Sequence, residues 1–292
     1  MEHQLYREIV AVLRRIGKRR RRRGEVFNDE EIVRTWFWGA IHDRPVSWTC
    51  QRRNGPLFER SNARPSNSTM SRRLRSDDVR KLLDQIEAEV LRPQRRWLLW
   101  MIDGKPLAIG GCSKDRQAGY GRAAGTMAKG YKLHAVFGPN FTVAAWRIAP
   151  MNKDERVMAR RLLREAPVQG YVLGDGNYDS NDLHDVCLNR EAVQFVSPRR
   201  YGPGRGTGHR PQSPSRLRSR ELLEGKSPFG RSLFDQRFLI EQHFGHLTSW
   251  GGGLNSLPPW ARTHRRVHRW VQAKLILTAL KQRLSSTTCV AS

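Results

Sequence analysis

The segment Trp97-Leu98-Leu99-Trp100-Met101-Ile102-Asp103-Gly104 is a short apolar run that ends at an acidic residue. Six apolar residues followed by Asp-Gly are typical of a buried β-strand and the turn after it. The segment Tyr171-Val172-Leu173-Gly174-Asp175-Gly176 repeats this pattern further along the chain. A third acid, Glu241, lies in the apolar-patterned stretch Leu233–Leu247, which we interpret as a helix. The sequence therefore predicts two strand-end carboxylates and one helix carboxylate.

The composition favours a nucleic-acid partner. The 292 residues include 53 Lys and Arg against 27 Asp and Glu, which gives a formal net charge of +26. A chain this basic binds polyphosphate at physiological salt. Its hydrophobic content of 38% and its nine Trp exclude a chain that is disordered throughout. A basic packaging or RNA-binding protein is an alternative, and the ordered carboxylates and the aromatic content argue against it.

The sequence also limits the cellular compartment. It has no run of about 20 apolar residues, so we expect no membrane span, and its N-terminus lacks the apolar core of a signal peptide. The four cysteines are Cys50, Cys112, Cys187 and Cys289. They form no CxxC pair, so the sequence indicates neither a zinc ribbon nor a disulfide framework. We therefore expect a protein of the reducing cytoplasm.

The N-terminal third has a helical pattern in two parts. Residues 1–24 predict an amphipathic helix from His3 to Gly17 and then a five-arginine run, Arg19–Arg23, which we interpret as a linker that contacts DNA phosphates. Residues 25–94 predict a small helical DNA-binding domain. Its helices are expected to begin near four capping residues: Asn28, Ser47, Ser66 and Asp77.

The stretch Ser66–Arg75 has the composition of a recognition helix. It is short and polar, and its side chains can donate to phosphates and to base edges. The residues expected to contact DNA are Ser68, Thr69, Ser71, Arg72, Arg73 and Arg75. We therefore predict a helix-turn-helix-like domain, with an ordinary exposed basic helix as the alternative.

Residues 95–285 predict a second, larger domain. The order is strand, hairpin, helix, strand, helix, strand, which favours a mixed α/β sheet with flanking helices. The expected elements are strand Trp97–Ile102, hairpin Tyr131–Phe137 and Phe141–Ile148, a helix capped by Asn152 and Glu155, strand Tyr171–Leu173, a helix capped by Asp179-Ser180, and strand Ala192–Val196. Two Gly-rich basic stretches, 119–130 and 198–232, are predicted to be mobile loops. A helix at Val267–Leu284 should close this domain, leaving residues 286–292 as a tail.

The three acids in this domain suit phosphodiester cleavage. Two Mg²⁺ or Mn²⁺ ions about 4 Å apart would neutralise the phosphate and activate the nucleophile. Asp103 would bridge the ions, while Asp175 and Glu241 would each serve one. Each acid also has a simpler explanation, because Asp103 and Asp175 could be turn residues and Glu241 could pair with Arg237 one turn away. The order of the three favours the joint interpretation.

Other polar residues near these acids are expected to be structural. Asp179 precedes Ser180 and fits a helix cap better than a ligand position. His134, His243 and His246 lack the spacing of a zinc site.

The same residues resemble the motifs of DDE transposases of bacterial insertion sequences, in the IS4/IS5-like group. Gly174–Ser180 resembles the second-aspartate motif, and Met101–Asp103 resembles the first-aspartate strand. Phe234-xx-Arg237-xxx-Glu241 resembles the Tyr-Arg-Glu part of the third motif. The helix at Pro65–Leu74 looks like the one in the family's DNA-binding region, and the likeness runs from Phe27 to Leu284.

This resemblance implies an RNase H-like core that holds Mg²⁺ through Asp103, Asp175 and Glu241. It also implies cleavage and strand transfer on double-stranded DNA, at terminal inverted repeats and at a target. Arg237 is expected to contact that DNA, and the protein to act as a homodimer or larger assembly near the bacterial nucleoid.

Two residues depart from the resembling family. Phe234 stands where the family has Tyr, and Thr248 stands where it has Lys seven residues after the Glu. Thr248 favours the alternative of a catalytically impaired, DNA-binding remnant. His246 and Lys274 are the candidates to replace the missing cation.

Overall fold

The computed structural model describes residues 1–17, 24–56, 63–91, 96–110, 113–123, 125–201, 211–225, 228–249, 253–254 and 256–290. The arginine run Arg19–Arg23 and the stretch Gly202–Gly208 lie outside these residues. The chain divides into two compact units: unit 1 contains Met1–Arg92, Ser249–Gly253 and Arg269–Ser292, and unit 2 contains Pro93–Thr248 and Leu254–His268. Within the described ranges, no helix has both the length and the apolar character needed to cross a bilayer.

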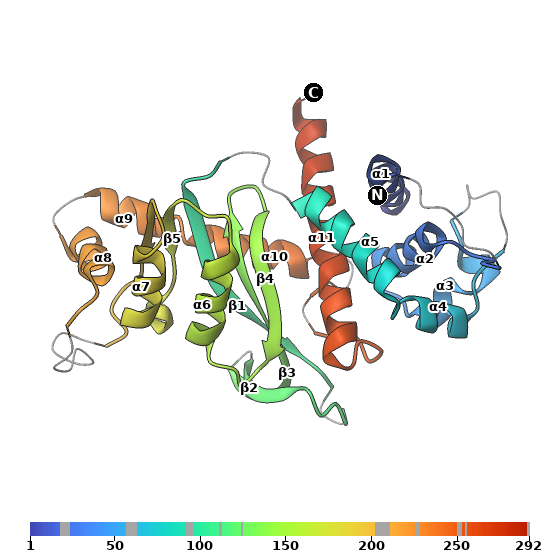
Figure 1. Cartoon of the computed structure of the whole chain (residues 1–292), viewed down its shortest axis with the longest axis horizontal. Helices are drawn as coiled ribbons and strands as arrows, with labels where there is room; N and C mark the ends of the chain where they lie inside the picture. The colour runs from blue at the N-terminus through green and yellow to red at the C-terminus, as the bar shows by residue number, and fades with distance from the viewer. Residues whose placement is uncertain are drawn as a thin grey trace. The chain divides into compact units, whose positions relative to one another are not determined.

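Unit 1 is built from helices (Figure 1). They are α1 (Glu2–Ile16), α2 (Asp29–Ile41), α3 (Val46–Thr49), the 3₁₀ turn η1 (Arg52–Asn54), α4 (Asn67–Arg73), α5 (Asp77–Leu91) and most of α11 (His264–Val290). The cap predicted for α2 is confirmed, because the Asn28 side chain accepts from the Glu31 N–H at 2.8 Å and the Glu31 side chain accepts from the Asn28 N–H at 2.7 Å. Helix α3 begins after Pro45 rather than at Ser47.

Helix α11 differs from its predicted role. From Arg269 onward it belongs to unit 1 instead of closing the sheet domain, and it continues to Val290 where a tail was expected. The reason is its apolar surface, because Trp270 is buried and packs edge-on against Trp36 of α2 at 6.0 Å between ring centroids. Its buried Lys274 forms an ion pair with Asp43 and donates to a backbone carbonyl.

Unit 2 contains a six-stranded mixed sheet. Its strands are β1 (Leu99–Ala108), β2 (Gly119–Ala123), β3 (Thr126–Gly138), β4 (Thr142–Pro150), β5 (Gly170–Leu173) and β6 (Val193–Val196). The long strand β3 pairs antiparallel with β1, β2 and β4. Strand β1 pairs parallel with β5, and β5 pairs parallel with β6. This arrangement confirms the predicted mixed α/β sheet with its flanking helices.

Helices cover both faces of this sheet (Figure 1). Helices α6 (Glu155–Glu165) and α7 (Asn181–Leu188) bury a core on one face, which includes Trp100, Ile102, Val136, Leu162, Leu183 and Phe195. Helix α10 (Phe238–Thr248) lies on the opposite face, where Phe137 packs against Phe244 at 5.6 Å between ring centroids. Because side chains alternate along a strand, β1 presents Ile102 to α6 and Asp103 to the α10 side.

Both Gly-rich stretches differ from the predicted loops. In the first stretch, Gly119–Ala123 of β2 pairs antiparallel with Thr126–Gly130 at the start of β3. A Cβ added at Gly130 would lie 2.2 Å from the carbonyl oxygen of Leu107, so this glycine permits close strand contact rather than mobility. Within residues 198–232, the described part contains α8 (Pro214–Glu224) and the first turns of α9 (Pro228–Asp235).

Candidate active site

Asp103 and Asp175 occupy matching positions on neighbouring parallel strands. The pairing of β1 with β5 ends at Met101 opposite Leu173, and each aspartate lies two residues further on. Beyond this point β1 continues alongside β3, so Asp103 lies within a strand and not at its end as predicted. Strand β5 instead stops, and Asp175 follows it. The two carboxylates therefore lie where the paired strands separate, at their carboxyl ends.

Asp175 also has a local structural role. Its side chain accepts a 2.9 Å hydrogen bond from the N–H of Asn177 and caps the 3₁₀ turn η2 (Gly176–Tyr178). One side-chain oxygen of Asp103 accepts from the N–H of Gly104 at 2.7 Å. The simple explanation offered by the sequence therefore holds for Asp175, which caps a turn, and not for Asp103, which lies within β1.

Asp103 is half-buried and lies close to other negative charges. Burial, followed by the charges of Asp175 and Glu155, raises the pKa of its carboxyl to about 6, although the N–H of Gly104 and the charge of Arg237 oppose this rise. A cation that approaches the ionised Asp103 carboxylate would therefore lower its free energy.

Arg237 connects Asp103 to Glu241. Its Nη2 lies 3.0 Å from Glu241 Oε1, and its Nη1 lies 4.0 Å from Asp103 Oδ2. The predicted helix Leu233–Leu247 is in fact two helices, α9 and α10, with a turn at Gln236–Arg237 between them. This turn places Arg237 just before α10, so that its guanidinium reaches acids on two different elements.

Lys132, Glu155 and Tyr178 have roles in this region that the sequence does not predict. Lys132 on β3 forms an ion pair with Glu155, the first residue of α6. The buried Tyr178 hydroxyl has no hydrogen-bond partner within the described residues. Burial, then the charges of Asp103, Glu155 and Asp175, hold the pKa of Tyr178 well above its usual value. The sequence predicts that Asn152 and Glu155 cap helix α6, whereas in the structure Asp154 caps it.

His134 and His243 behave as neutral packing residues. Burial is the main reason that the pKa values of His134 and His243 fall to about 4. A ring nitrogen of His243 lies 3.0 Å from the carbonyl oxygen of Gly138. In the described part of the chain, no three His, Cys, Asp or Glu side chains already converge closely enough to hold a metal ion.

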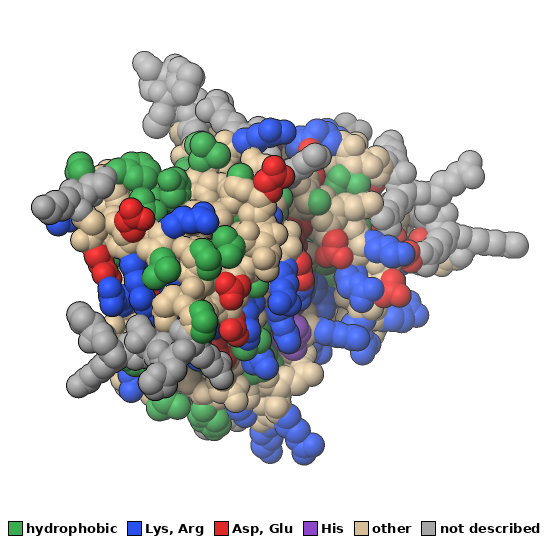
Figure 2. Space-filling model, turned by 60° about the vertical axis from the view of Figure 1, so that its left-hand side comes forward, with side chains coloured by type: hydrophobic (Ala, Val, Ile, Leu, Met, Phe, Trp, Pro, Cys, Tyr) green, Lys and Arg blue, Asp and Glu red, His purple; other side chains and the backbone are tan. Residues whose placement is uncertain are grey.

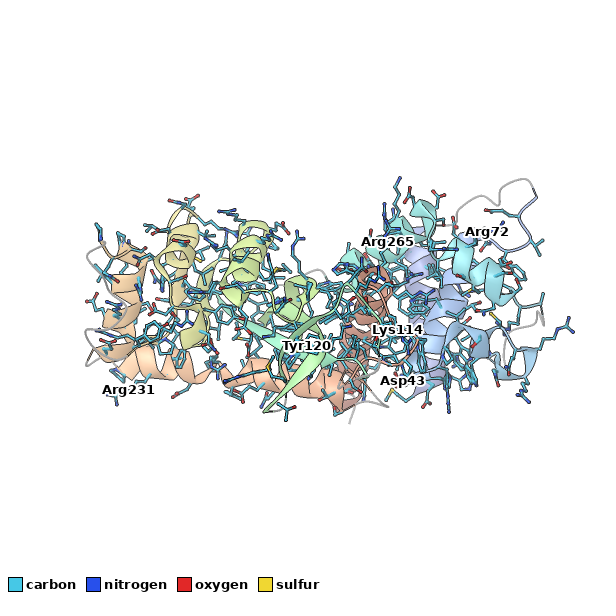
Figure 3. The ribbon with its side chains drawn as sticks, turned by 90° about the horizontal axis from the view of Figure 1, so that it is seen from below. Asp43, Arg72, Lys114, Tyr120, Arg231 and Arg265 are labelled. Atoms are coloured by element: carbon cyan, nitrogen blue, oxygen red, sulfur yellow. The ribbon has the colours of Figure 1, made fainter. Side chains whose placement is uncertain are left out.

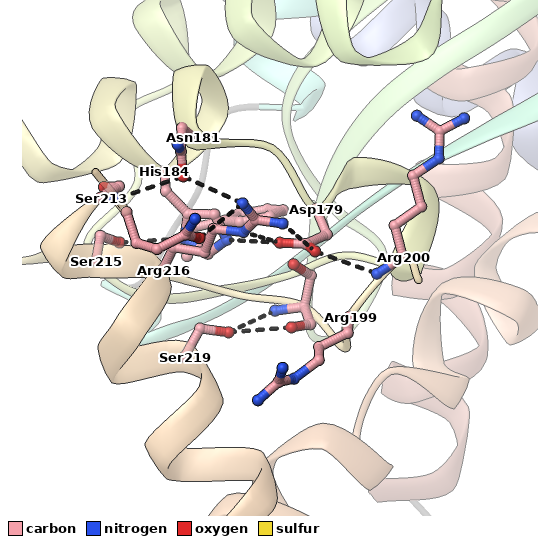
Figure 4. Close-up of polar contacts among 12 residues, drawn as sticks. Asp179, Asn181, His184, Arg199, Arg200, Ser213, Ser215, Arg216 and Ser219 are labelled. Atoms are coloured by element: carbon pink, nitrogen blue, oxygen red, sulfur yellow. Dashed lines mark hydrogen bonds and ion pairs between the residues drawn. The ribbon is translucent and has the colours of Figure 1, made fainter. Parts of the chain in front are cut away.

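Asp179 is not the helix cap that we expected. Ser180 occupies the N-cap position of α7, and its side chain makes no capping bond. The buried Asp179 carboxylate instead binds Arg216 of α8 through two hydrogen bonds, and accepts a third from the N–H of Arg200 at 3.1 Å (Figure 4). Because these bonds use both of its oxygens, Asp179 is a structural residue.

The predicted recognition helix α4 lies in unit 1. The Ser66 side chain caps it by accepting from the N–H of Thr69 at 3.1 Å. Ser68, Arg72 and Arg75 are exposed, and Arg72 is labelled in Figure 3. Thr69 and Ser71 are half-buried.

Arg73 differs from the other arginines of α4. It lies 2.7 Å from Asp29 and 3.2 Å from Glu25, and it donates to the carbonyl of Phe27 at 2.8 Å. This guanidinium is occupied within the fold, which does not fit the predicted base contact.

Comparisons with known proteins agree with the motifs. Residues 99–280 match the protein family described as "Transposase DDE domain". No curated protein matches the chain. Among solved structures, the cryo-EM structure of the piggyBac transposase synaptic complex with hairpin DNA has a TM-score of 0.49 and 12% sequence identity, over 94% of this chain and 68% of that one. A structural likeness of this size is too weak to carry an argument.

Proposed function

Because the chain belongs to the transposase DDE domain family, we propose that it binds the ends of a DNA transposon and catalyses metal-dependent strand cleavage and strand transfer. The family places the chain among the proteins of DNA transposition and recombination. One observation carries the rest of the proposal. Asp103 and Asp175 each lie two residues past the point where the pairing of β1 with β5 ends, and Arg237 links Asp103 to Glu241.

The donor set fits divalent metal ions. Asp103, Asp175 and Glu241 offer only carboxylate oxygens, which Mg²⁺ and Mn²⁺ prefer. The raised pKa of Asp103 is a second point in favour, because its causes, burial first and then the charges of Asp175 and Glu155, disfavour an isolated carboxylate that a bound cation would stabilise. Bound there, two ions would neutralise the scissile phosphate and activate the attacking water or hydroxyl.

The basic residues of the site would hold DNA. A guanidinium matches the planar arrangement of phosphate oxygens, so we propose that Arg237 exchanges Glu241 for a DNA phosphate. The face drawn in Figure 2 suits a polyanion, since Lys and Arg side chains lie at many points of it. Helix α4 would read the transposon end through Ser68, Thr69, Ser71, Arg72 and Arg75.

The architecture supports a finer assignment of the fold. Leaving β2 aside, the strand order β4-β3-β1-β5-β6, with only β3 antiparallel to its neighbours, is the order of an RNase H-like core. We propose such a core within residues 95–285, a helix-turn-helix-like DNA-binding domain at 25–94 and a basic arm at 1–24. We also propose membership of the IS4/IS5-like group and a homodimer or larger assembly on bacterial DNA.

A catalytically impaired DNA-binding remnant is the second candidate. One observation favours it, because the Thr248 hydroxyl donates to the carbonyls of Gly245 and Phe244 at 2.7 and 3.2 Å. Thr248 is thus engaged within its own helix and does not replace the lysine of the resembling motif.

The decisive experiment is a nicking assay. A labelled duplex that carries the element's terminal repeat is incubated with the full-length protein and with Mg²⁺, Mn²⁺ or EDTA. Nicking at the repeat boundary in Mg²⁺ or Mn²⁺, and its loss in EDTA, is the result expected of a transposase. Specific binding of the repeat without nicking in either metal would identify the remnant instead.

A further inference from the structure

Lys105 lies on the same face of β1 as Asp103. The two residues are two positions apart on one strand, so their side chains point to the same side of the sheet. Ile102 belongs to the core under α6 and α7, so Asp103 and Lys105 face the opposite side, where α10 contacts β1.

The ammonium group of Lys105 lies beside α10. Its Nζ is 5.9 Å from the centroid of the Phe244 ring. Phe244 is three residues after Glu241 and four before Thr248, so these three side chains share one side of the helix. Lys105 therefore brings a positive charge to the stretch of α10 that runs from Glu241 to Thr248.

Among the residues that the structure describes, no anionic group pairs with this ammonium group. Lys105 is half-buried, and within the described residues its only recorded interaction is with the Phe244 ring. The other basic side chains near the acids are occupied: Lys132 pairs with Glu155, and Arg237 pairs with Glu241. A partly desolvated charge without a partner costs free energy, and such groups are found where a ligand completes the pairing.

The sequence suggests Lys274 and His246 as replacements for the cation that is missing at Thr248, and neither of them replaces it. Lys274 is buried in unit 1, and Asp43 and the Ala40 carbonyl occupy its ammonium group. His246 is exposed on α10 and comes five residues after Glu241, which turns it by about 140° around the helix away from the side of Glu241. Thr248 donates its hydroxyl to its own helix.

We propose that Lys105 binds a DNA phosphate next to the bond that is cut, and so supplies the cation that α10 lacks at Thr248. This inference rests on the proposed function. The flexible stem of a lysine allows its ammonium group to follow a phosphate as a point charge. Lys105 acts on substrate position and charge, and it transfers no proton.

The first arm of the test compares matched variants of the full-length protein. Lys105→Met keeps the apolar stem over Phe244 and removes the charge, and Lys105→Arg keeps the charge. The control is Lys153→Met, because Lys153 is an exposed lysine of the same unit. Binding of the terminal-repeat duplex is measured in EDTA across a salt series, and nicking is measured in Mn²⁺. Thermal melting of each variant verifies that it folds.

The expected result separates charge from packing. Lys105→Met should melt like wild type, yet bind the duplex and nick it about 10- to 100-fold less well, the range expected for a lost charge-assisted bond. Lys105→Arg should recover most of this loss, and Lys153→Met should stay within about 2-fold of wild type. Wild-type binding by a well-folded Lys105→Met in EDTA would overturn the inference, whether or not the wild type nicks.

The second arm locates the phosphate. A set of duplexes carries one neutral methylphosphonate at successive positions around the cut. At the position that Lys105 contacts, the difference in binding between wild type and Lys105→Met should disappear, while other positions should preserve it. A difference that persists at every position would show that Lys105 contacts no single phosphate. Absence of nicking by the wild type in Mg²⁺ and Mn²⁺ would count against the proposed function, while the binding data would still decide the role of Lys105.

Discussion

Arg216 binds Asp179 through two parallel hydrogen bonds, Nε to Oδ1 and Nη2 to Oδ2, each 2.6 Å long. Both side chains are buried, and Arg216 also donates to the side chains of Asn181 and Gln212. The pair connects the segment after Asp175 to helix α8, as Figure 4 shows. It therefore fixes the chain that leaves the proposed metal site.

Loss of this pair should destabilise the fold. Asp179→Ala leaves the Arg216 guanidinium buried without its partner, and we expect a loss of about 3–5 kcal/mol in the free energy of unfolding. Chemical denaturation monitored by Trp fluorescence measures it. Asp182→Ala is the matched control, because Asp182 pairs with Arg160 with 71% of its side chain exposed, and should cost about 1 kcal/mol or less. Equal losses for the two variants would contradict the structural role of Asp179.

The same cluster should make the fold sensitive to acid. Burial is the main cause that lowers the pKa of His184 to about 4 from 6.5, so the folded state favours the neutral ring. Its contribution to stability is complete above pH 6.5 and is lost as the pH falls toward 4, at most roughly 3 kcal/mol. Burial alone would raise the pKa of Asp179, but the bonds from Arg216 and Arg200 outweigh it and the net shift is downward. Its contribution is therefore lost only below about pH 3.8.

Melting curves between pH 7 and 4 can separate the two groups. The wild type should lose stability progressively over this range, and His184→Gln should show a flatter dependence. A wild-type midpoint that does not change from pH 6.5 to 4.5 would mean that His184 titrates normally.

The three proposed ligands should be individually essential. Asp103→Ala, Asp175→Ala and Glu241→Gln are each expected to abolish nicking in Mg²⁺ and Mn²⁺, because each removes a carboxylate that would hold an ion. Binding of the terminal repeat in EDTA should survive, since α4 lies in the other unit. Asp182→Asn is the control acid and should keep nearly full activity. A variant that nicks at a wild-type rate would remove its residue from the site.

Two adjacent arginines of α4 should respond differently. Arg72→Ala should cost about 1–3 kcal/mol of binding to the terminal repeat and reduce discrimination against random DNA, if this exposed residue reads a base. Arg73→Ala should lower the melting temperature instead, because Arg73 holds Asp29, Glu25 and the Phe27 carbonyl. Equal losses of Arg72→Ala on specific and random DNA would reject the base contact.

The basic arm should act without sequence preference. Neutralising Arg19–Arg23, for example with glutamines, should weaken binding to every duplex and flatten its dependence on salt. A gel-shift series over increasing salt, on specific and random DNA, measures both effects. A loss confined to the terminal repeat would show that the run reads bases.

The sheet could be predicted from the sequence because its strands are apolar runs with turn residues between them. Hairpin β3–β4 and strands β5 and β6 follow this rule, and Asp175 was correctly expected beside a strand. The extension of β1 past Asp103 could not be predicted, since Gly104 and Pro106 are usually poor strand residues and here β3 pairs with them. Gly119 and Gly130 led to the wrong prediction of a loop for a related reason. Glycine is common in loops, but it also occurs in strands where another backbone approaches closely.

The sequence predicts the three acids of the candidate site, which stays a prediction, but it does not predict the cations around them. The motif spacing pointed to Asp103, Asp175 and Glu241, but ion pairs between distant segments leave no local pattern. Lys132 with Glu155, and Arg216 with Asp179, are examples. Lys105 did have a signal, since it is two residues from Asp103 and strand alternation places both on one face. Only the structure could show that no acid among the described residues pairs with Lys105.

Thr248→Lys gives a last prediction that depends on Lys105. Seven residues are about two helical turns, so a lysine at 248 would project from the same side of α10 as Glu241. If Lys105 already supplies the charge, Thr248→Lys in the wild-type background should change nicking by less than about 2-fold at moderate salt. In the Lys105→Met background the same change should restore much of the lost nicking and the salt dependence of binding. Side-by-side nicking of the four proteins across a salt series makes the comparison, with Ser249→Lys as the control for added charge at an exposed neighbour. A large gain from Thr248→Lys in the wild type would show that the site lacks a cation that Lys105 does not replace.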